Sequence, residues 1–264
     1  MAFQDKVVWI TGASSGIGEA LAYAFSERGA RLILSSRRRD ELERVKANCA
    51  GDSGTIHVLT LDLVETDTLP AKAAEAVEIF GRIDLLFNNG GISQRSLAVD
   101  AEMEVIRRVM EINFFGTVAL TKAVLPHMLE RGEGHIAVTS SVMGKFGTRL
   151  RSTYAASKHA LHGWFDCLRQ EVYGEGLQVS LVCPGYVKTQ VTVNALEGDG
   201  SRHGEMGRGQ KQGMAPETFA KKLLPKLARG KPEIYIGGTE IIAIYLKRFA
   251  PRLLNWVLRR SEVT

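Results

Sequence analysis

The stretch Thr11-Gly12-Ala13-Ser14-Ser15-Gly16-Ile17-Gly18 decides the fold of this 264-residue chain. It directly follows the apolar run Val7–Ile10 and opens a segment with helical periodicity, so it predicts a strand, a glycine turn and a helix. Gly12 suits the tight turn, Gly16 lets the backbone approach a ligand, and Gly18 lets helix and strand pack closely. Because a helix N-terminus attracts anions, we interpret the turn as a pyrophosphate-binding loop.

The same turn permits two other interpretations. It could be a glycine-rich turn that binds no ligand. Residues Gly12–Gly16 also read Gly-x-Ser-x-Gly, the nucleophile elbow of α/β serine hydrolases. An elbow in the first turn of a chain is unusual, and no oxyanion-loop signature accompanies it. The hydrolase is therefore the remote alternative.

Short β-rich runs alternate with longer helical patterns along most of the chain, which is typical of βαβ units and a parallel sheet. We expect one Rossmann-type domain over residues 1–238, a doubly wound seven-stranded parallel α/β sheet with helices on both faces. The expected strands are Val7–Thr11, Arg31–Ser35, Thr55–Thr60, Ile83–Phe87, His135–Thr139, Gln178–Val182 and Glu233–Ile236. The expected helices include Gly18–Arg28, Arg38–Asn48, Ala71–Phe80, Ala101–Arg131 and Tyr154–Tyr173.

Two segments depart from this alternation. The stretch Gly198–Gly213 is rich in glycine and charge, which predicts a long mobile loop within a substrate loop at about 190–214. The tail 239–264 mixes apolar and basic residues over Glu240–Arg260, which predicts an amphipathic helix. We expect its apolar face to cover the substrate cleft or a subunit interface; the alternative is peripheral contact with a membrane surface.

Bulk composition narrows the function classes. The net charge is +5 and the basic residues are dispersed, which gives nucleic-acid binding little support. Three scattered cysteines, Cys49, Cys167 and Cys183, form neither a disulfide framework nor a metal-ligand pattern, so we expect a reducing compartment and no metal. The first apolar run is too short for a signal peptide. We therefore expect a cytoplasmic protein, with peripheral membrane contact as the alternative.

The residues after the second expected strand bear on the choice of dinucleotide. NAD-binding Rossmann proteins usually place a carboxylate there, but this chain has Ser36 followed by Arg37-Arg38-Arg39. Arginines form planar charge-assisted hydrogen bonds with a phosphate, so the pattern favours NADP(H). Asp62-Leu63 offers a carboxylate after the third strand, either for an adenine amino group or to cap the following helix.

Tyr154-Ala155-Ala156-Ser157-Lys158 begins a helical pattern in which Tyr154 and Lys158 share one helix face. A phenol with its ordinary pKa near 10 needs a neighbouring cation to exchange protons near neutral pH. Lys158 is spaced to supply that cation and to hold the ribose of a bound cofactor beside the phenol. An isolated pair of this kind is more often two surface residues, so its meaning depends on the motifs around it.

With these motifs together, the chain resembles the short-chain dehydrogenases/reductases over nearly its whole length. The matching motifs are Thr11–Gly18, Asp62-Leu63, Asn88-Asn89-Gly90-Gly91, Asn113, Ser140-Ser141, Tyr154 with Lys158, and Pro184–Thr189. The resemblance implies that Ser141 holds the substrate oxygen, Tyr154 is the general acid or base, and Asn113 holds a water that links Lys158 to solvent. One departure is Gly90, where the family usually has alanine.

The resemblance also implies the binding residues. Those expected at the cofactor are Gly12, Ser14, Ser15, Gly16, Ile17, Gly18, Arg37, Arg38, Asp62, Leu63, Asn89, Gly90, Tyr154, Lys158, Pro184, Gly185, Val187 and Thr189. At the substrate the resemblance implies Ser141, and we expect Met143, Phe146 and Tyr186 there because they follow the ends of the expected strands.

The implied activity is hydride transfer between NADP(H) and a carbonyl or secondary alcohol. Within the family, Tyr154–Arg169 and 184–200 are similar to the dehydrogenase/reductase member-seven branch, which suggests a lipophilic small-molecule substrate. The family also implies a homodimer or homotetramer built on the long helices Ala101–Arg131 and Tyr154–Tyr173. An NADP(H)-binding sensor or scaffold without turnover is the alternative from another functional class.

Overall fold

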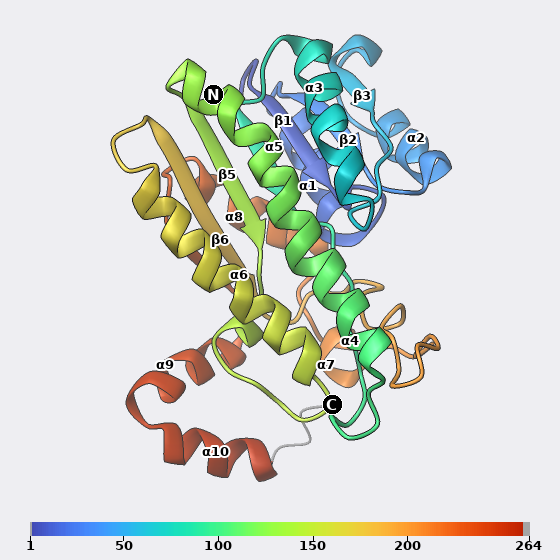
Figure 1. Ribbon diagram of the computed structural model, residues 1–264, viewed down its shortest axis with the longest axis vertical. Helices are drawn as coiled ribbons and strands as arrows, with labels where there is room; N and C mark the ends of the chain where they lie inside the picture. The colour runs from blue at the N-terminus through green and yellow to red at the C-terminus, as the bar shows by residue number, and fades with distance from the viewer. Residues whose placement is uncertain (1, 261–264) are drawn as a thin grey trace.

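A seven-stranded parallel sheet forms the centre of the computed structural model, which describes residues 2–260 (Figure 1). The strand order is β3-β2-β1-β4-β5-β6-β7. The strands are β1 Val7–Thr11, β2 Arg31–Ser35, β3 Ile56–Val58, β4 Leu85–Asn88, β5 Gly134–Thr139, β6 Leu177–Pro184 and β7 Glu233–Ile236. This confirms the predicted fold class, and the observed β3 is shorter than the expected strand.

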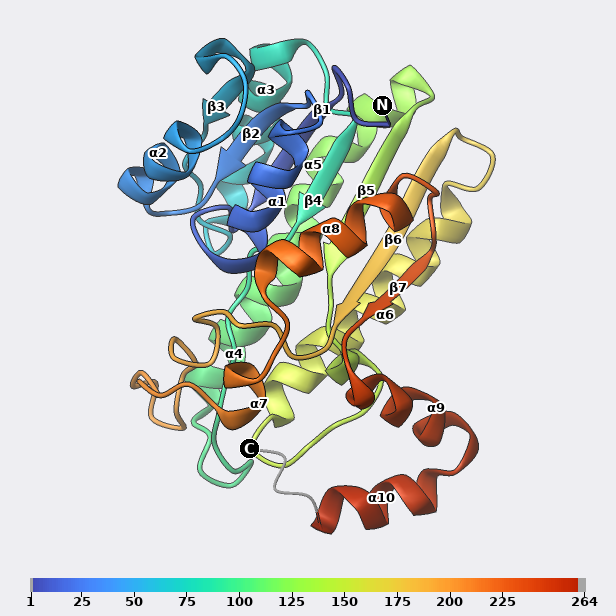
Figure 2. The same ribbon diagram turned by 180° about the vertical axis from the view of Figure 1, so that it is seen from behind.

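Helices cover both faces of the sheet because neighbouring strand residues point to opposite sides. On β1, Val8 and Ile10 pack in one apolar core and Val7 and Trp9 in the other. The first core contains α1 Gly16–Ser26, α2 Arg39–Ala47 and α8 Pro216–Leu227 (Figure 2). The second contains α3 Leu69–Phe80, α5 Gly116–Arg131 and α6 Ser152–Glu171. The 3₁₀ turns are η1 Ser53–Thr55, η2 Thr66–Thr68, η4 Val142–Gly144 and η5 Thr239–Ile241.

The helix expected over Ala101–Arg131 is interrupted by a turn of π-helix. It comprises α4 Met103–Met110, a π-helical turn η3 Glu111–Phe115, and α5. The π turn contains Asn113, and such turns widen a helix by one residue, often at functional sites. Apolar periodicity alone did not reveal it.

The order of the strands places the ligand crevice. Consecutive strands add outward from β1 toward β3, then the chain returns to β4 on the other side of β1. In open α/β sheets the crevice lies at this reversal, beyond the carboxyl ends of the strands. The loops that follow β1, β4, β5 and β6 therefore converge on one edge.

The tail forms two helices, α9 Ile242–Phe249 and α10 Pro251–Arg260, so the prediction of one continuous helix is wrong. The residue before a proline is pushed out of the helical region, and Ala250 accordingly has φ −141° and ψ 61°. The two helices form an arm beside the carboxyl edge of the sheet (Figure 2). Residues 261–264 of the predicted tail lie outside the described residues.

The expected long loop Gly198–Gly213 contains one short helix, α7 Arg208–Lys211. Its entry is tied down by bridge pairs of Leu196 with Gln94 and Arg202, and its exit by a pair between Val187 and Met214. Within residues 2–260, none of the helices combines the length and the apolar character needed to cross a bilayer.

Candidate active site

A cavity of about 1450 Å³ lies at the carboxyl edge of the sheet and extends under the tail. It gathers most of the site residues predicted from the sequence. The ones that line it are Gly12, Ser14, Ser15, Gly16, Ile17, Arg37, Arg38, Asp62, Leu63, Asn89, Gly90, Ser141, Met143, Phe146, Tyr154, Lys158, Pro184, Gly185, Tyr186, Val187 and Thr189. Gly18 and Asn113 are not in the cavity lining, but they contact residues that are.

The conformation of the glycine loop is fixed by its glycines and by hydrogen bonds from Asn89. Gly12 has φ +64°, a conformation that favours glycine, and a Cβ on Gly18 would overlap the carbonyl of Gly12. The side-chain amide of Asn89 donates to the Thr11 carbonyl at 3.2 Å, and the Asn89 backbone N–H donates to the Thr11 hydroxyl at 3.0 Å. These bonds assign Asn89 to the support of the loop and leave the loop backbone open to a ligand.

The glycine at position 90 has a packing explanation. A Cβ built on Gly90 would lie 2.8 Å from Cδ1 of Leu63, closer than ordinary contact allows. The Gly90 N–H donates to the same Thr11 hydroxyl at 3.0 Å, so the backbone cannot retreat without losing that bond. An alanine at position 90 would therefore require the Leu63 side chain to shift.

Of the three arginines after β2, Arg38 reaches the glycine loop. Arg38 donates to the hydroxyl of Ser14 at 3.0 Å, and Arg37 lies 4.0 Å from a carboxylate oxygen of Asp62. The other Asp62 oxygen accepts the N–H of Val64 at 3.1 Å, so Asp62 makes a local turn while it lines the cavity. Ser14, the nucleophile in the hydrolase interpretation, is thus paired with an arginine rather than prepared for attack.

Ser141 and Tyr154 meet across the cavity wall. Ser141 lies at the start of η4, where its hydroxyl accepts the Met143 N–H at 3.1 Å, and both it and Tyr154 line the cavity. Burial raises the pKa of Tyr154, while the nearby Ser141 hydroxyl and the charge of Arg151 lower it. The phenol therefore stays protonated until a cation or a cofactor favours its anion.

Lys158 lies one helical turn beyond Tyr154 and is only 4% exposed. Its ammonium donates to the carbonyl of Thr139 at 2.8 Å and lies 5.7 Å from the centroid of the Tyr154 ring. Burial lowers the pKa of Lys158 to about 8. The structure thus brings this cation beside the phenol, as the spacing of the two residues predicted.

Asn113 is fully buried and its side chain joins two segments. Its Oδ1 accepts the Ile92 N–H at 2.8 Å, and its Nδ2 donates to the Ile92 carbonyl at 2.9 Å and to the Ser157 hydroxyl at 3.0 Å. Both amide hydrogens are therefore used inside the protein. Asn113 fixes the loop after β4 against α6, next to Lys158 in the helix.

Sequence reasoning missed two residues of this site. Arg151 precedes α6, where a cation opposes the helix dipole, and that conflict was the available signal. Glu240 reaches in from the start of the tail and accepts the N–H groups of Tyr186 at 2.9 Å and Gly238 at 3.0 Å. No local motif marks Glu240 as a site residue, because its partner in the site, Tyr186, lies far away in the sequence.

Further segments complete the cavity wall. A Cβ on Gly16 would lie 3.0 Å from Cγ2 of Thr189, so the segment after β6 closes over the glycine loop. The inner faces of α9 and α10 line the other end of the cavity through Ile242, Ala243, Leu246, Leu254, Val257 and Leu258. The cavity therefore has a polar end at the glycine loop and an apolar end at the tail.

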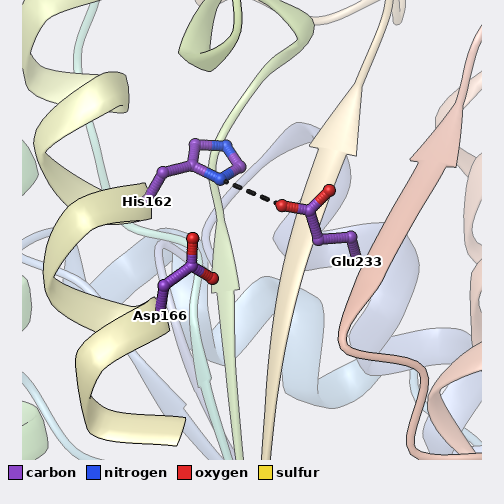
Figure 3. Close-up of side chains that lie close together, drawn as sticks. All are labelled: His162, Asp166 and Glu233. Carbon is purple, nitrogen blue, oxygen red and sulfur yellow. Dashed lines mark ion pairs between the residues drawn. The ribbon is translucent and has the colours of Figure 1, made fainter. Parts of the chain in front are cut away.

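Side chains from α6 and β7 form a cluster of His162, Asp166 and Glu233 (Figure 3). His162 Nδ1 lies 3.5 Å from Glu233, and Glu233 also pairs with Lys145 at 2.5 Å. Asp166 pairs with Arg169 at 2.7 Å. Each carboxylate already pairs with a cation outside the cluster, so we interpret the three side chains as a polar contact between α6 and β7 rather than as a metal site.

The model of the short chain dehydrogenase family matches residues 6–200. The chain belongs to this family. It is 43% identical over 263 residues to a Drosophila melanogaster protein named dehydrogenase/reductase SDR family protein 7-like, covering 98% of this chain and 81% of that one. It is 41% identical over 262 residues to human dehydrogenase/reductase SDR family member 7, with coverages of 97% and 77%. The resemblance to the member-seven branch is confirmed, and the chain is a short-chain dehydrogenase/reductase-type oxidoreductase.

Solved structures have the same fold. A short-chain dehydrogenase from Streptomyces avermitilis superposes with a TM-score of 0.83 at 27% identity, covering 99% of this chain and 100% of that one. Two others at 24% identity are complexes: one from Burkholderia phymatum with NAD has a TM-score of 0.82, with coverages of 100% and 98%. One from Burkholderia cenocepacia with NADP has a TM-score of 0.80, with coverages of 99% and 100%.

Proposed function

We propose that the chain is an NADP(H)-dependent oxidoreductase that interconverts a carbonyl compound and the corresponding secondary alcohol. The observation that carries the proposal is the convergence of Ser141, Tyr154 and Lys158 in the same cavity as the glycine loop. A nicotinamide cofactor supplies or accepts the hydride when it is bound. Each of the three side chains has a role that follows from its contacts.

The roles divide by chemistry. In reduction, the Ser141 hydroxyl and the Tyr154 phenol hold the carbonyl oxygen, which gains negative charge in the transition state. Tyr154 then donates its proton to that oxygen, and the Lys158 cation stabilises the phenolate that remains. In oxidation the phenolate accepts the proton from the alcohol. Asn113, which bonds to Ser157 on α6, is a positioning residue for this pair and the candidate for the proton relay.

The charges beside the glycine loop support NADP(H) rather than NAD(H). Arg37 and Arg38 both line the cavity, and the Arg38 contact with Ser14 brings its cation to the loop. A 2′-phosphate carries charge that these guanidinium groups can bind in a bidentate manner. Asp62 is the carboxylate nearest Arg37, and a phosphate would compete with it for that arginine.

The apolar end of the cavity supports a lipophilic substrate. Four of the side chains from α9 and α10 that line it belong to an apolar cluster with Val142 and Phe146, namely Ala243, Leu246, Leu254 and Leu258. Burial of apolar substrate surface against them contributes about 25 cal/mol for each square ångström removed from water. Met143, Phe146 and Tyr186 are the proposed substrate contacts nearest to Ser141.

We also propose that the protein forms a homodimer or homotetramer and that its tail touches membrane surfaces. Apolar side chains are exposed on the long helices at Met103, Phe115 and Leu129, which supports an oligomer contact there. The outer face of the tail exposes Tyr245, Phe249, Leu253 and Trp256 beside several basic residues, which supports interfacial binding.

The experiment that tests the activity is a screen of aliphatic and cyclic ketones with NADPH, followed by loss of absorbance of the reduced cofactor. We expect Tyr154→Phe to lower kcat at least 100-fold with an unchanged dissociation constant for NADPH. Near-normal turnover by Tyr154→Phe would contradict the mechanism. Tight NADPH binding without turnover of any ketone would favour the sensor or scaffold instead.

A further inference from the structure

We propose that Arg151 forms an anion subsite in the active site, so that the preferred carbonyl substrates carry a carboxylate or phosphate group. This inference rests on the proposed function and adds a substrate class to it. The relevant observations concern the donors of Arg151, the charges around it and its place beside the phenol.

Arg151 is buried, with 8% of its surface exposed, and it lines the cavity. One nitrogen, Nη1, donates to the Ser93 hydroxyl at 2.9 Å and to the Gln94 carbonyl at 3.1 Å. A guanidinium has five N–H donors, so Nε and Nη2 hold three more. Within residues 2–260 these three have no hydrogen-bond partner, and neither nitrogen is sealed off from the cavity. They are free to bind a ligand.

The charge of Arg151 is not balanced by the protein. Among the described residues, no carboxylate lies within 4.0 Å of its guanidinium, whereas buried charges are normally paired. Burial lowers the pKa of Arg151, and the nearby cation of Arg95 lowers it further. Glu197 attracts Arg151 at longer range but is hydrogen-bonded to His203 at 2.5 Å. A bound anion would supply the missing charge.

The surroundings of Arg151 favour an anion further. Arg95 has a buried Nη1 without a partner, and its charge also reaches Tyr186. Arg151 immediately precedes the 20-residue helix α6, whose first backbone N–H groups attract negative charge. Glu240, a carboxylate in the cavity lining, already accepts two backbone N–H groups. Arg151 and Arg95 together therefore give this corner of the cavity a positive charge that a ligand anion would balance.

The position of Arg151 relative to Tyr154 limits how far the anionic group of a substrate can lie from its carbonyl group. Arg151 is three residues before Tyr154, about one helical turn, and its charge lowers the pKa of that phenol. An anionic group on Arg151 therefore lies beside the carbonyl held by Tyr154 and Ser141. The apolar remainder of the molecule extends toward the inner faces of α9 and α10. Amphiphilic oxo acids and oxo phosphates have this shape.

The test measures binding and turnover separately on the full chain with NADPH bound. Calorimetry compares octanoate and octyl phosphate with uncharged methyl octanoate, and NADPH oxidation compares 2-oxooctanoate with its methyl ester. We expect the anions to bind at least about tenfold more tightly than the ester, with the stronger of the two identifying carboxylate or phosphate as the natural group. The ratio of kcat/KM for acid over ester should exceed one by a similar factor.

Arg151→Gln should abolish both preferences, and Arg151→Lys should keep part of them because it retains the charge but loses the planar fork. Arg149→Gln is the matched control, since it removes the same charge from an exposed position two residues away. The melting temperature and the NADPH dissociation constant of each variant report on folding. The lysine variant keeps the test valid if the glutamine variant does not fold.

The outcomes separate the two proposals. If the wild type turns over the ester but shows no preference for anions, the anion subsite is refuted and the oxidoreductase stands. If Arg151→Gln keeps the preference, the subsite is likewise refuted. If anions bind through Arg151 but no ketone is reduced, the subsite stands and the proposed activity fails.

Discussion

Lys158 donates its ammonium to the backbone carbonyl of Thr139 at 2.8 Å, which ties the catalytic helix to the carboxyl end of β5. The bond fixes the position of the Lys158 ammonium beside the Tyr154 ring. It also keeps a positive charge in a place where burial disfavours it, since the pKa of Lys158 falls to about 8. The site therefore retains this charge at the expense of stability near neutral pH.

The first prediction concerns that stability. Between pH 8 and the ordinary lysine pKa of 10.5, unfolded Lys158 binds a proton that folded Lys158 has lost, so stability rises with pH. The wild type should gain about 2 kcal/mol relative to Lys158→Met between pH 7 and pH 10. Urea unfolding of both proteins at pH 7, 8.5 and 10 measures the difference. If the free energies of unfolding of the two proteins changed with pH in the same way, burial would not shift the pKa of Lys158.

The second prediction concerns the choice of cofactor. Replacing either Arg37 or Arg38 with serine should lower kcat/KM for NADPH about tenfold or more and leave the NADH value within about threefold. Arg39→Ser is the control, because Arg39 is exposed and pairs with Glu43 at 3.6 Å outside the cavity. A parallel loss with both cofactors, or an equal loss in the control, would count against a phosphate site.

The third prediction concerns Asn113. Asn113→Leu should reduce the free energy of unfolding by about 3 kcal/mol or more, because it leaves the Ile92 backbone and Ser157 without their buried partner. Ser157→Ala removes one of these bonds and the bond from Ser157 to the Tyr154 carbonyl, but it leaves the Ile92 backbone paired and should cost less, about 1–2 kcal/mol. Chemical denaturation of both variants checks the order. Equal losses of unfolding free energy in the two variants would mean that the bonds between Asn113 and Ile92 do not contribute to stability.

The fourth prediction separates the two faces of the tail. Leu254 is 1% exposed and faces the cavity, whereas Trp256 is 54% exposed. Leu254→Ala should raise KM for lipophilic ketones severalfold, and Trp256→Ser should weaken flotation with anionic phosphatidylserine vesicles without changing KM. Flotation that is the same for wild type and Trp256→Ser would refute membrane contact by this face.

The fifth prediction concerns assembly. Phe115 is 49% exposed between α4 and α5. A charge at the centre of an apolar contact destabilises it, so Phe115→Glu should shift an oligomer toward monomer, whereas Tyr173→Glu near the end of α6 should shift it less. Light scattering after size exclusion measures the mass of each protein. A monomeric wild type would refute the proposed oligomer.

Strands were the elements best predicted from sequence. Five-residue apolar runs such as Val7–Thr11 and Arg31–Ser35 were matched to the residue, because central parallel strands are buried on both faces. The π turn at Glu111–Phe115 and the break at Ala250 were not predicted. The first leaves apolar periodicity almost unchanged, and the second required weighting Pro251 above the amphipathic pattern around it.

The sequence by itself determined the glycine turn and the helical spacing of Tyr154 and Lys158, because these depend on residues close in the chain. It also determined the parallel sheet, because apolar strand runs that alternate with helical patterns favour βαβ units. Only the tertiary structure decided which side chains meet from distant segments. It set Asn89 under the glycine loop, joined Asn113 to Ser157, brought Glu240 to Tyr186 and left Arg151 buried without a counter-ion. Such contacts depend on how the loops converge beyond the sheet, and no local pattern encodes that geometry.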